Sequence, residues 1–244
     1  MIVGTLILNP TKESIISLAK GNFDFLLLDF QHSAFTWETA DFVIETIYKY
    51  TNKKIWLRVS NNNFSDINRA YDIGADAVVV PLVNTVNDLK NCIDASRYKP
   101  IGNRSWGPVR LRENYNSYED YFKNAYSNQL LFPQIESLEG LNNLSEMCTH
   151  DGWDGVMIGP SDLAISMGEV PNFPPKSQLV KDKMEEIITI CKNNKKIPGL
   201  FAGSLDVAKE FVSKGAECFT YGSDLEFLDE GTKISFENLH NSMK

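Results

Sequence analysis

The sequence predicts a single (β/α)8 barrel, a TIM barrel, that spans residues 1–244. Eight short apolar runs recur along the chain, segments with helical spacing separate them, and no G-x-G-x-x-G turn follows the first run. Alternation of strands and helices is typical of a parallel sheet, and the missing glycine-rich turn favours a closed barrel over an open doubly wound sheet. A length of 244 residues is usual for one such barrel.

The apolar runs have the composition of strands that are buried on both faces. They are rich in β-branched and aromatic residues and mostly lack polar alternation. In chain order the predicted strands are Ile2–Leu8, Phe25–Asp29, Ile55–Val59, Ala77–Leu82, Leu130–Glu136, Gly155–Ile158, Ile197–Phe201 and Cys218–Tyr221.

The segments between these strands carry the periodicity of amphipathic helices. Three of the helices are expected to begin after the capping residues Thr36, Asn84 and Ser204. The tripeptides Gly74–Asp76 and Gly215–Glu217 each predict a helix that ends at glycine before the next strand. Helices are expected at Trp37–Tyr50, Phe64–Asp72, Thr85–Arg97, Leu138–Cys148, Leu179–Asn193, Leu205–Ser213 and, at the C-terminus, about residues 224–244.

Two connections are longer than a barrel needs. The segment Lys99–Arg112 is rich in Gly, Pro and Arg and precedes the tyrosine-rich segment Tyr115–Tyr126, and the loop Gly168–Pro175 holds three prolines. Long loops in barrels commonly form lids or contacts with a partner, so both are expected to be functional.

Composition excludes several classes of function. The formal net charge of −8, with dispersed Lys and Arg, argues against a nucleic-acid partner. No segment has the length of a bilayer-spanning helix, and the N-terminus lacks the pattern of a signal peptide, so no membrane partner and a cytoplasmic location are expected. The four scattered cysteines are interpreted as reduced thiols, with a zinc site as the alternative.

Polar residues cluster where the predicted strands end. In a barrel these ends meet at one mouth, where the catalytic residues of barrel enzymes lie. The residues expected there are Asp29, Gln31, His32, Arg58, Gln134, Glu136, Ser161 and Asp162.

Glu136 and Asp162 follow neighbouring strands and offer a pair of hard oxygen ligands. Carboxylates without a Cys or His cluster suit Mg²⁺, Mn²⁺ or Co²⁺, with water and substrate as the other ligands. The sequence therefore predicts a divalent metal site between these two residues. The alternative is that each carboxylate merely caps a helix, because acidic residues are common at helix N-termini.

His32 and Arg58 are the other candidates for chemistry at this mouth. His32 is a candidate general base whose tautomer the nearby Asp29 could fix, and a purely structural histidine is the alternative. Arg58 ends a buried strand and is expected to bind an anionic substrate, with a buried ion pair to a neighbouring acid as the alternative.

With these residues in hand, the chain resembles the HpcH/HpaI family of metal-dependent, class II 2-oxo acid aldolases. The resemblance covers nearly the whole chain, and its motifs occur in the family's order. They are Phe23–His32, Leu57–Val59, Asp72–Asp76, Val79–Val83, Arg97–Gly107, Pro133–Ser137 and Gly155–Gly168.

This resemblance implies a barrel of the phosphoenolpyruvate/pyruvate-binding type that cleaves or forms 4-hydroxy-2-oxo acids from pyruvate and an aldehyde. It implies that Glu136 and Asp162 ligate the metal, and that His32 is the base, acting through a water on the metal. The family also implies that Asp72 orients His32. The oxo acid would be bound by Gln134, Ser161 and the backbone at Pro160–Asp162. Arg58 would bind its oxo group and stabilise the enolate.

The chain departs from the family's commonest pattern at two places in these motifs. Phe30 and Gln31 stand where Gly and Glu usually precede the histidine, which removes a negative charge beside the base, and Trp106 is expected to reshape the pocket. Two other readings stay open: another enolate-forming lyase or decarboxylase, and a non-catalytic barrel that binds a 2-oxo acid. A homo-oligomer in which the C-terminal helix packs on a neighbour is implied by the resemblance.

Overall fold

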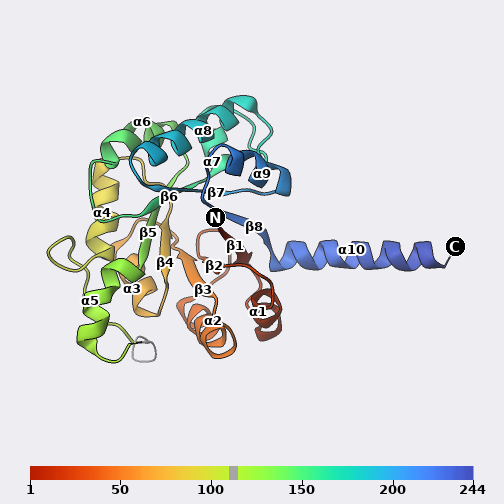
Figure 1. Ribbon diagram of the computed structural model, residues 1–244, viewed down its shortest axis with the longest axis horizontal. Coiled ribbons are helices and arrows are strands. Elements are labelled where there is room, and N and C mark those ends of the chain that lie inside the picture. The colour runs from red at the N-terminus through yellow and green to blue at the C-terminus, as the bar shows by residue number, and fades with distance from the viewer. Residues whose placement is uncertain (110–114, 244) are drawn as a thin grey trace.

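Parallel strands close into a barrel in the computed structural model, which describes residues 1–109 and 115–243 (Figure 1). Each strand pairs with its neighbours in the sequence, and β1 closes the barrel by pairing with β8. All eight predicted strands are confirmed, with ends that differ by at most two residues. Their bounds are β1 Ile2–Ile7, β2 Phe25–Asp29, β3 Lys54–Arg58, β4 Ala77–Val80, β5 Leu130–Ile135, β6 Gly155–Ile158, β7 Ile197–Phe201 and β8 Cys218–Ser223.

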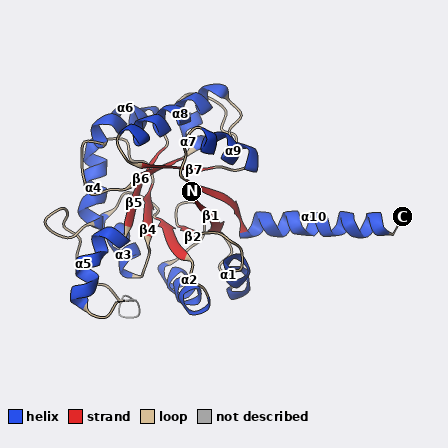
Figure 2. Ribbon diagram, viewed as in Figure 1, coloured by secondary structure: helices blue, strands red, loops and turns tan. Residues whose placement is uncertain are grey.

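Helices surround the barrel and cover the outer face of the sheet (Figure 2). The helices expected from periodicity are present. Helices α1 and α5 were not expected, and of α7 only a helix start at Pro160–Asp162 was expected. Their bounds are α1 Lys12–Ala19, α2 Trp37–Tyr50, α3 Phe64–Asp72, α4 Val86–Ser96, α5 Tyr118–Asn128, α6 Leu138–Met147, α7 Pro160–Ser166, α8 Gln178–Asn193, α9 Leu205–Ser213 and α10 Asp224–Ser242.

The alternation of side chains along each strand divides the core into two layers. Phe25 and Leu27 of β2 point into the barrel, where they join Trp56 of β3 and Phe132 of β5, with the Phe25 and Trp56 rings stacked at 4.0 Å. The intervening residues, such as Leu26, point outward and pack against the helices. The strands therefore read as continuous apolar runs because both of their faces are buried.

Local sequence signals explain most helix boundaries. The hydroxyl of Thr36 accepts a hydrogen bond from Thr39 N at the start of α2, and Ser204 caps α9 in the same way. The expected cap of α4, Asn84, is corrected to Thr85, which forms a capping box with Asp88. Asn84 does not cap the helix because its side-chain oxygen instead accepts a hydrogen bond from Ser137.

The long connection after α4 lies at the end of the barrel where the strands begin. Arg97, at the start of this connection, donates hydrogen bonds to the carbonyls of Gln129 and Gly152, which directly precede β5 and β6. Trp106 packs against the rings of Tyr98 and Tyr121. The part of the connection at 110–114 lies outside the described residues.

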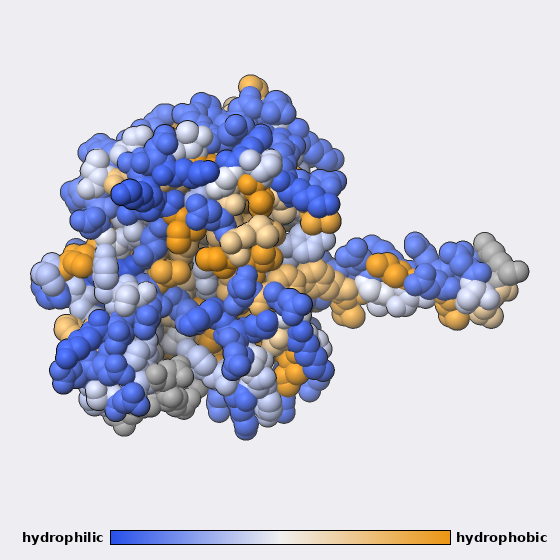
Figure 3. All heavy atoms as spheres, viewed as in Figure 1, coloured by the Kyte–Doolittle hydropathy of each residue, from blue (hydrophilic) through white to orange (hydrophobic). Residues whose placement is uncertain are grey.

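Helix α10 projects away from the barrel (Figure 1). The expectation of a C-terminal helix is confirmed up to Ser242. Its only buried residue among those described is Asp224, whose carboxylate accepts hydrogen bonds from Leu8 N, Asn9 N and the Ser14 hydroxyl. Asp224 thus anchors the start of the helix to β1 and α1, while the rest extends into solvent. In Figure 3 apolar side chains are visible along the projecting helix.

Candidate active site

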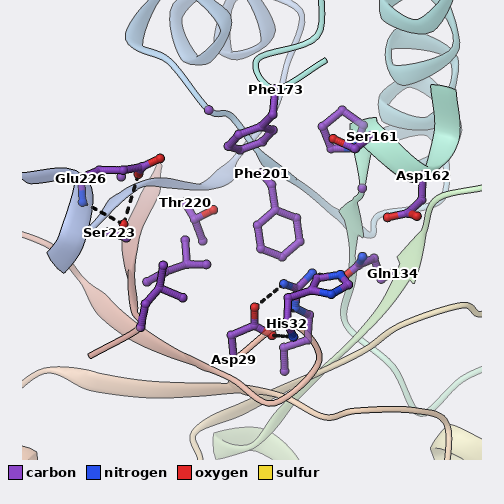
Figure 4. Close-up of a pocket in the computed structure, with 17 residues that line it drawn as sticks. Asp29, His32, Gln134, Ser161, Asp162, Phe173, Phe201, Thr220, Ser223 and Glu226 are labelled. Carbon is purple, nitrogen blue, oxygen red and sulfur yellow. Dashed lines mark hydrogen bonds and ion pairs between the residues drawn. The ribbon is translucent and has the colours of Figure 1, made fainter. Parts of the chain in front are cut away.

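A cavity of about 300 Å³ opens at the ends of the strands. His32, Arg58, Gln134, Ser161 and Asp162, all predicted from the sequence, line it together (Figure 4). They come from the ends of β2, β3 and β5 and from the start of α7. The carboxyl end of the barrel is where the strand-end rule places an active site.

Strand periodicity explains why these polar side chains face one another. Asp29 stands two residues after Leu27 in β2, and Arg58 stands two residues after Trp56 in β3, so both continue the row that points into the barrel. Asp29 and Arg58 are also direct partners in the β2–β3 register. The same alternation carries Phe132 of β5 on to Gln134.

Arg58 and Asp29 form a buried ion pair at the bottom of the cavity. Arg58 Nε lies 2.8 Å from Asp29 Oδ1, and Nη2 lies 2.5 Å from Oδ2, a bidentate pair with both side chains nearly inaccessible to water. The alternative stated for Arg58, a buried ion pair with a neighbouring acid, is therefore found. The guanidinium also lies over the Phe201 ring at 4.7 Å.

Arg58 keeps one group directed toward the rest of the site. Its Nη1 lies 3.5 Å from Gln134 Oε1. The amide of Gln134 in turn donates to Glu136 Oε2, and Glu136 Oε1 accepts a hydrogen bond of 2.7 Å from Leu82 N. A continuous chain of polar contacts thus runs from Asp29 through Arg58 and Gln134 to Glu136, across the ends of β2, β3 and β5.

The electrostatics of Glu136 fit a cation at this position. Glu136 is 1% exposed, and burial raises its pKa, while hydrogen bonds from Leu82 and Gln134 lower it. The negative charge of Asp162 raises the pKa of Glu136 further. Two carboxylates whose charges interact in this way repel, and a bound cation would relieve both the repulsion and the burial.

Close packing around Glu136 also fits a site built for its carboxylate. Gly159, at the end of β6, approaches so closely that a Cβ there would lie 2.6 Å from Glu136 Oε2. Each carboxylate oxygen has two lone pairs, so Glu136 can keep its hydrogen bonds and still bind a metal ion. Among residues 1–109 and 115–243, no group of three or more His, Cys, Asp or Glu could hold a metal ion. Two protein carboxylates with water and substrate form a usual site for Mg²⁺.

Ser161 and Asp162 enter the cavity from the first turn of α7. Gly159 is the N-cap residue, and it offers no side chain to satisfy the first amides of the helix. Pro160 follows as the first helical residue, a position that suits proline because it needs no N–H there. The expectation that these residues lie at a helix start beside the cavity is met.

His32 lies on the loop after β2 and borders the cavity. Its backbone N lies 3.4 Å from Asp29 Oδ1, and Gln31 N lies 2.9 Å from the same oxygen. Asp29 therefore fixes the backbone of this loop and the guanidinium of Arg58. No hydrogen bond joins Asp29 to the His32 ring among the described residues, so the expectation that Asp29 sets the tautomer of that ring stays a prediction.

Two other residues predicted to take part in the site, Asp72 and Trp106, lie away from the cavity in this chain. Asp72 does not line the cavity: it ends α3, and its carboxylate accepts hydrogen bonds of 2.8 Å from Arg104 Nη2 and 2.6 Å from Asn68 Nδ2. Burial raises the pKa of Asp72, and the hydrogen bond and charge of Arg104 oppose the rise. Trp106 does not shape the cavity either, because its connection lies at the opposite end of the barrel. Within this chain, Asp72 binds Arg104 and Asn68 at that opposite end, and its role toward His32 stays a prediction.

Sequence reasoning missed the other half of the cavity. It is lined by residues within or just after β1, β7 and β8 and by one side chain of the proline-rich loop Gly168–Pro175. The strand-end rule could have found most of them, but apolar and hydroxyl side chains carry no chemical signature on their own. They are Leu6, Leu8, Phe173, Phe201, Thr220, Ser223 and Glu226.

Two further expectations concern membranes and cysteines. None of the helices within the described ranges is long and apolar enough to cross a bilayer. Cys92, Cys148, Cys191 and Cys218 are all free, and only Cys148 is partly exposed. The zinc alternative is not supported by the described residues, since no suitable cluster of ligands occurs among them.

Comparison with known proteins gives a consistent result. The HpcH/HpaI aldolase/citrate lyase family model matches residues 8–230. A 4-hydroxy-2-oxo-heptane-1,7-dioate aldolase of Salmonella dublin is 31% identical over 217 residues, which cover 88% of this chain and 81% of the relative. The crystal structure of a HpcH/HpaI aldolase/citrate lyase family protein from Burkholderia cenocepacia superposes with a TM-score of 0.89 at 21% identity, covering 98% of this chain and 94% of that chain. The crystal structure of a HpcH/HpaI aldolase from Desulfitobacterium hafniense superposes with a TM-score of 0.88 at 19% identity, covering 98% of this chain and 92% of that chain.

Proposed function

The chain belongs to the HpcH/HpaI aldolase/citrate lyase family, and we propose that it is a metal-dependent aldolase that forms and cleaves 4-hydroxy-2-oxo acids. It is a carbon–carbon lyase, and pyruvate and an aldehyde are its proposed partners in the reaction. The observation that carries the proposal is the cavity that Arg58, Gln134 and Asp162 share, with Glu136 bound to Gln134.

The bond changes of the proposed reaction determine what these residues must do. A proton leaves the methyl carbon of pyruvate, a bond forms between that carbon and the aldehyde carbon, and the aldehyde oxygen gains a proton. Negative charge develops on the 2-oxo oxygen of pyruvate when the proton leaves. The site must therefore hold the oxo acid, stabilise that oxygen and accept the proton.

A divalent cation is the proposed cofactor, held by Glu136 and Asp162, with Mg²⁺, Mn²⁺ and Co²⁺ as the candidates. When bound, it supplies a Lewis acid beside the oxo acid, which makes the enolate accessible near neutral pH. Arg58 Nη1 and the Gln134 amide are positioned to bind oxygen atoms of the oxo acid, because both reach the cavity from the polar chain described above. Ser161 and the first amides of α7 are proposed to bind the carboxylate.

His32 is the proposed base. It is the only histidine among the residues that line the described cavity, and imidazole accepts protons near neutral pH. The bidentate pair between Asp29 and Arg58 prevents the guanidinium from rotating away from the oxo acid, and Asp29 also holds the backbone of the His32 loop. One buried carboxylate thus positions both groups.

The experiment that tests the proposal is proton exchange into pyruvate. Purified enzyme is incubated with pyruvate in D₂O, first with EDTA and then with Mg²⁺, Mn²⁺ or Co²⁺, and the methyl signal is followed by NMR. We expect the signal to decay only when metal is present, and the Glu136→Ala variant to show no decay. If no metal supports exchange, the aldolase proposal is wrong. Exchange without cleavage of any 4-hydroxy-2-oxo acid would favour another enolate-forming lyase or decarboxylase.

We further propose that the enzyme is a cytoplasmic homo-oligomer. Four free cysteines within the described residues suit a reducing compartment. The projecting helix α10 supports the oligomer, because apolar side chains along it stay in contact with solvent in a single chain. Leu228 is 63% exposed and Phe236 is 68% exposed. Exposed apolar surface of this kind marks protein–protein contacts in many soluble proteins.

A further inference from the structure

The cavity has two chemically different ends. Asp162 and Gln134 lie on one side in Figure 4, and Ser223 and Glu226 lie on the opposite side, with Phe201 and Thr220 between them. The first side holds the residues proposed to bind the oxo acid. The second side is therefore the place where the aldehyde lies, a statement that rests on the proposed function.

The described residues on the second side offer no positive charge to an aldehyde. Among the residues that line the described cavity the basic ones are His32 and Arg58, and both belong to the oxo-acid side. Arg58 is already neutralised by its bidentate pair with Asp29. Among the described residues that line the cavity, the charged group on the aldehyde side is the exposed carboxylate of Glu226, and Leu6, Leu8 and Phe173 line the same cavity.

The helix that carries Glu226 does not offer an anion site in place of a basic residue. Glu226 lies in the first turn of α10, where free amides would attract a carboxylate. The amide of Leu225 lies 3.1 Å from Asp224 Oδ1, and the amide of Glu226 lies 3.2 Å from Ser223 Oγ. Ser223 Oγ also lies 3.3 Å from Glu226 Oε2. These donors are thus used within the protein, and negative charge is already present.

We propose that this enzyme takes a short, uncharged aldehyde, and that Glu226 discriminates against aldehydes that carry a carboxylate. The volume of about 300 Å³ suits two small molecules, and it lies at the low end of small-molecule pockets. The Salmonella dublin relative is named for a heptane-1,7-dioate, whose aldehyde half carries the second carboxylate. This chain, which is 31% identical to that relative, would therefore differ from it in its electrophile.

The test compares two aldehydes of equal chain length, butanal and succinic semialdehyde. The value of kcat/KM for addition of pyruvate is measured for each with Mn²⁺ present, and the ratio of the two values is the readout. We expect butanal to be favoured by about tenfold or more, since a like charge held near the surface of a protein costs roughly this factor. Equal use of both aldehydes would overturn the proposal.

Substitutions at position 226 test the residue itself. Glu226→Gln keeps the acceptor oxygen for Ser223 and removes the charge, so the preference for butanal is expected to shrink by about five- to tenfold. Glu226→Lys is expected to shrink it further. The control is Glu237→Lys on the same helix. It changes the net charge by the same amount as Glu226→Lys but lies far from the cavity, so the ratio should stay as in the wild type. If Glu226→Gln leaves the ratio unchanged, another residue discriminates between the two aldehydes and the proposed role of Glu226 is wrong.

Pyruvate exchange in D₂O separates this inference from the proposed function. The exchange needs no aldehyde, so its absence in the wild type would remove the aldolase proposal itself. Exchange together with equal use of the two aldehydes would leave the aldolase proposal intact and remove only the specificity. Because the readout is a ratio, a general loss of activity in a variant cancels.

Discussion

Asp29 is the residue on which the polar chain of the site depends most. It binds Arg58 through two hydrogen bonds, and its Oδ1 also lies near the backbone amides of Gln31 and His32. The sequence predicted that Asp29 lies at the mouth but suggested a different partner, the His32 ring. The register of neighbouring strands decides the partner, because Asp29 is opposite Arg58 in the β2–β3 ladder. That register cannot be read from one strand alone.

Loss of this carboxylate should cost considerable stability. Asp29→Ala leaves the guanidinium of Arg58 buried without its partner, and removal of one member of a buried ion pair typically costs about 3–5 kcal/mol. We expect the free energy of unfolding in urea to fall by that amount. Asp66→Ala, at a partly exposed position in the first turn of α3, is the control and should change it by less than about 1 kcal/mol. A fall for Asp29→Ala as small as that of the control would contradict the buried-pair interpretation.

The raised pKa of Glu136 makes a prediction about metal binding and pH. In the metal-free enzyme burial holds the pKa of Glu136 above the ordinary value of 4.5. Glu136 therefore begins to take up a proton at a higher pH than an exposed glutamate, and the proton competes with the cation. Binding of the cation should consequently weaken as the pH falls toward the raised pKa.

Thermal unfolding measures this competition. The increase in Tm that Mn²⁺ causes should shrink steadily as the pH is lowered from neutral toward 4.5, the ordinary pKa of glutamate. Glu136→Ala should show little increase at any pH in this range. A stabilisation by Mn²⁺ that stays constant across the range, or one that survives in Glu136→Ala, would show that Glu136 is not a ligand.

At the level of elements, the strands and most of the helices could be predicted because their signals are local. Runs of buried residues, capping hydroxyls and glycine C-caps gave all eight strands and most helices. Helix α1 was missed because it is short, and α5 was missed because its tyrosines suggested a contact surface. The long connection after α4 was expected to form a lid or a contact with a partner. Its buried arginines pack at the opposite end of the barrel from the cavity, so the contact with a partner is the expectation that stays open. Sequence spacing shows how long a loop is but not on which end of the barrel it lies.

The approach of β6 to Glu136 provides a prediction at this scale. In Gly159→Ala the new Cβ would lie 2.6 Å from Glu136 Oε2 and 2.8 Å from Glu136 Cβ, so the carboxylate must move. We expect kcat/KM to fall by about 100-fold although no ligand is removed, because a displacement near 1 Å at a catalytic group has an effect of this size.

The matched control for this change lies on α10. A Cβ at Gly231 would meet no atom within 4 Å, so Gly231→Ala should keep wild-type activity in the aldolase assay. Steady-state kinetics of both variants, with far-UV circular dichroism to confirm folding, measure the difference. Wild-type kinetics in Gly159→Ala would show that Glu136 need not stay in its observed position.

At the level of the whole molecule, most of α10 has no packing partner within the described residues of the single chain. The helix contacts the barrel only near its start, while Leu228 and Phe236 are largely exposed. The double variant Leu228→Ser, Phe236→Ser removes apolar surface without changing the barrel. We expect it to sediment as a smaller species than the wild type at the same concentration in analytical ultracentrifugation.

Its control is the double variant Lys233→Ser, Glu237→Ser on the same helix. Both residues are exposed and polar, so the wild-type species should persist. If the wild type itself sediments as a monomer, or if the apolar double variant assembles as the wild type does, the proposed role of α10 is wrong. Oligomer order was not predictable from the sequence, because it depends on a partner surface that no single-chain pattern describes.

The position of the polar chain on strands has a consequence for protein engineering. Asp29, Arg58 and Gln134 lie within strands, whereas Phe173 and Glu226 lie on the segments that follow α7 and β8. Exchange of those two segments between related barrels should therefore change which aldehyde is accepted and leave the oxo-acid side of the cavity unchanged. Transplantation of the oxo-acid side into another scaffold would require β2, β3, β5 and the start of α7 to move together in register. The two sides of the cavity therefore differ in how easily they can be redesigned.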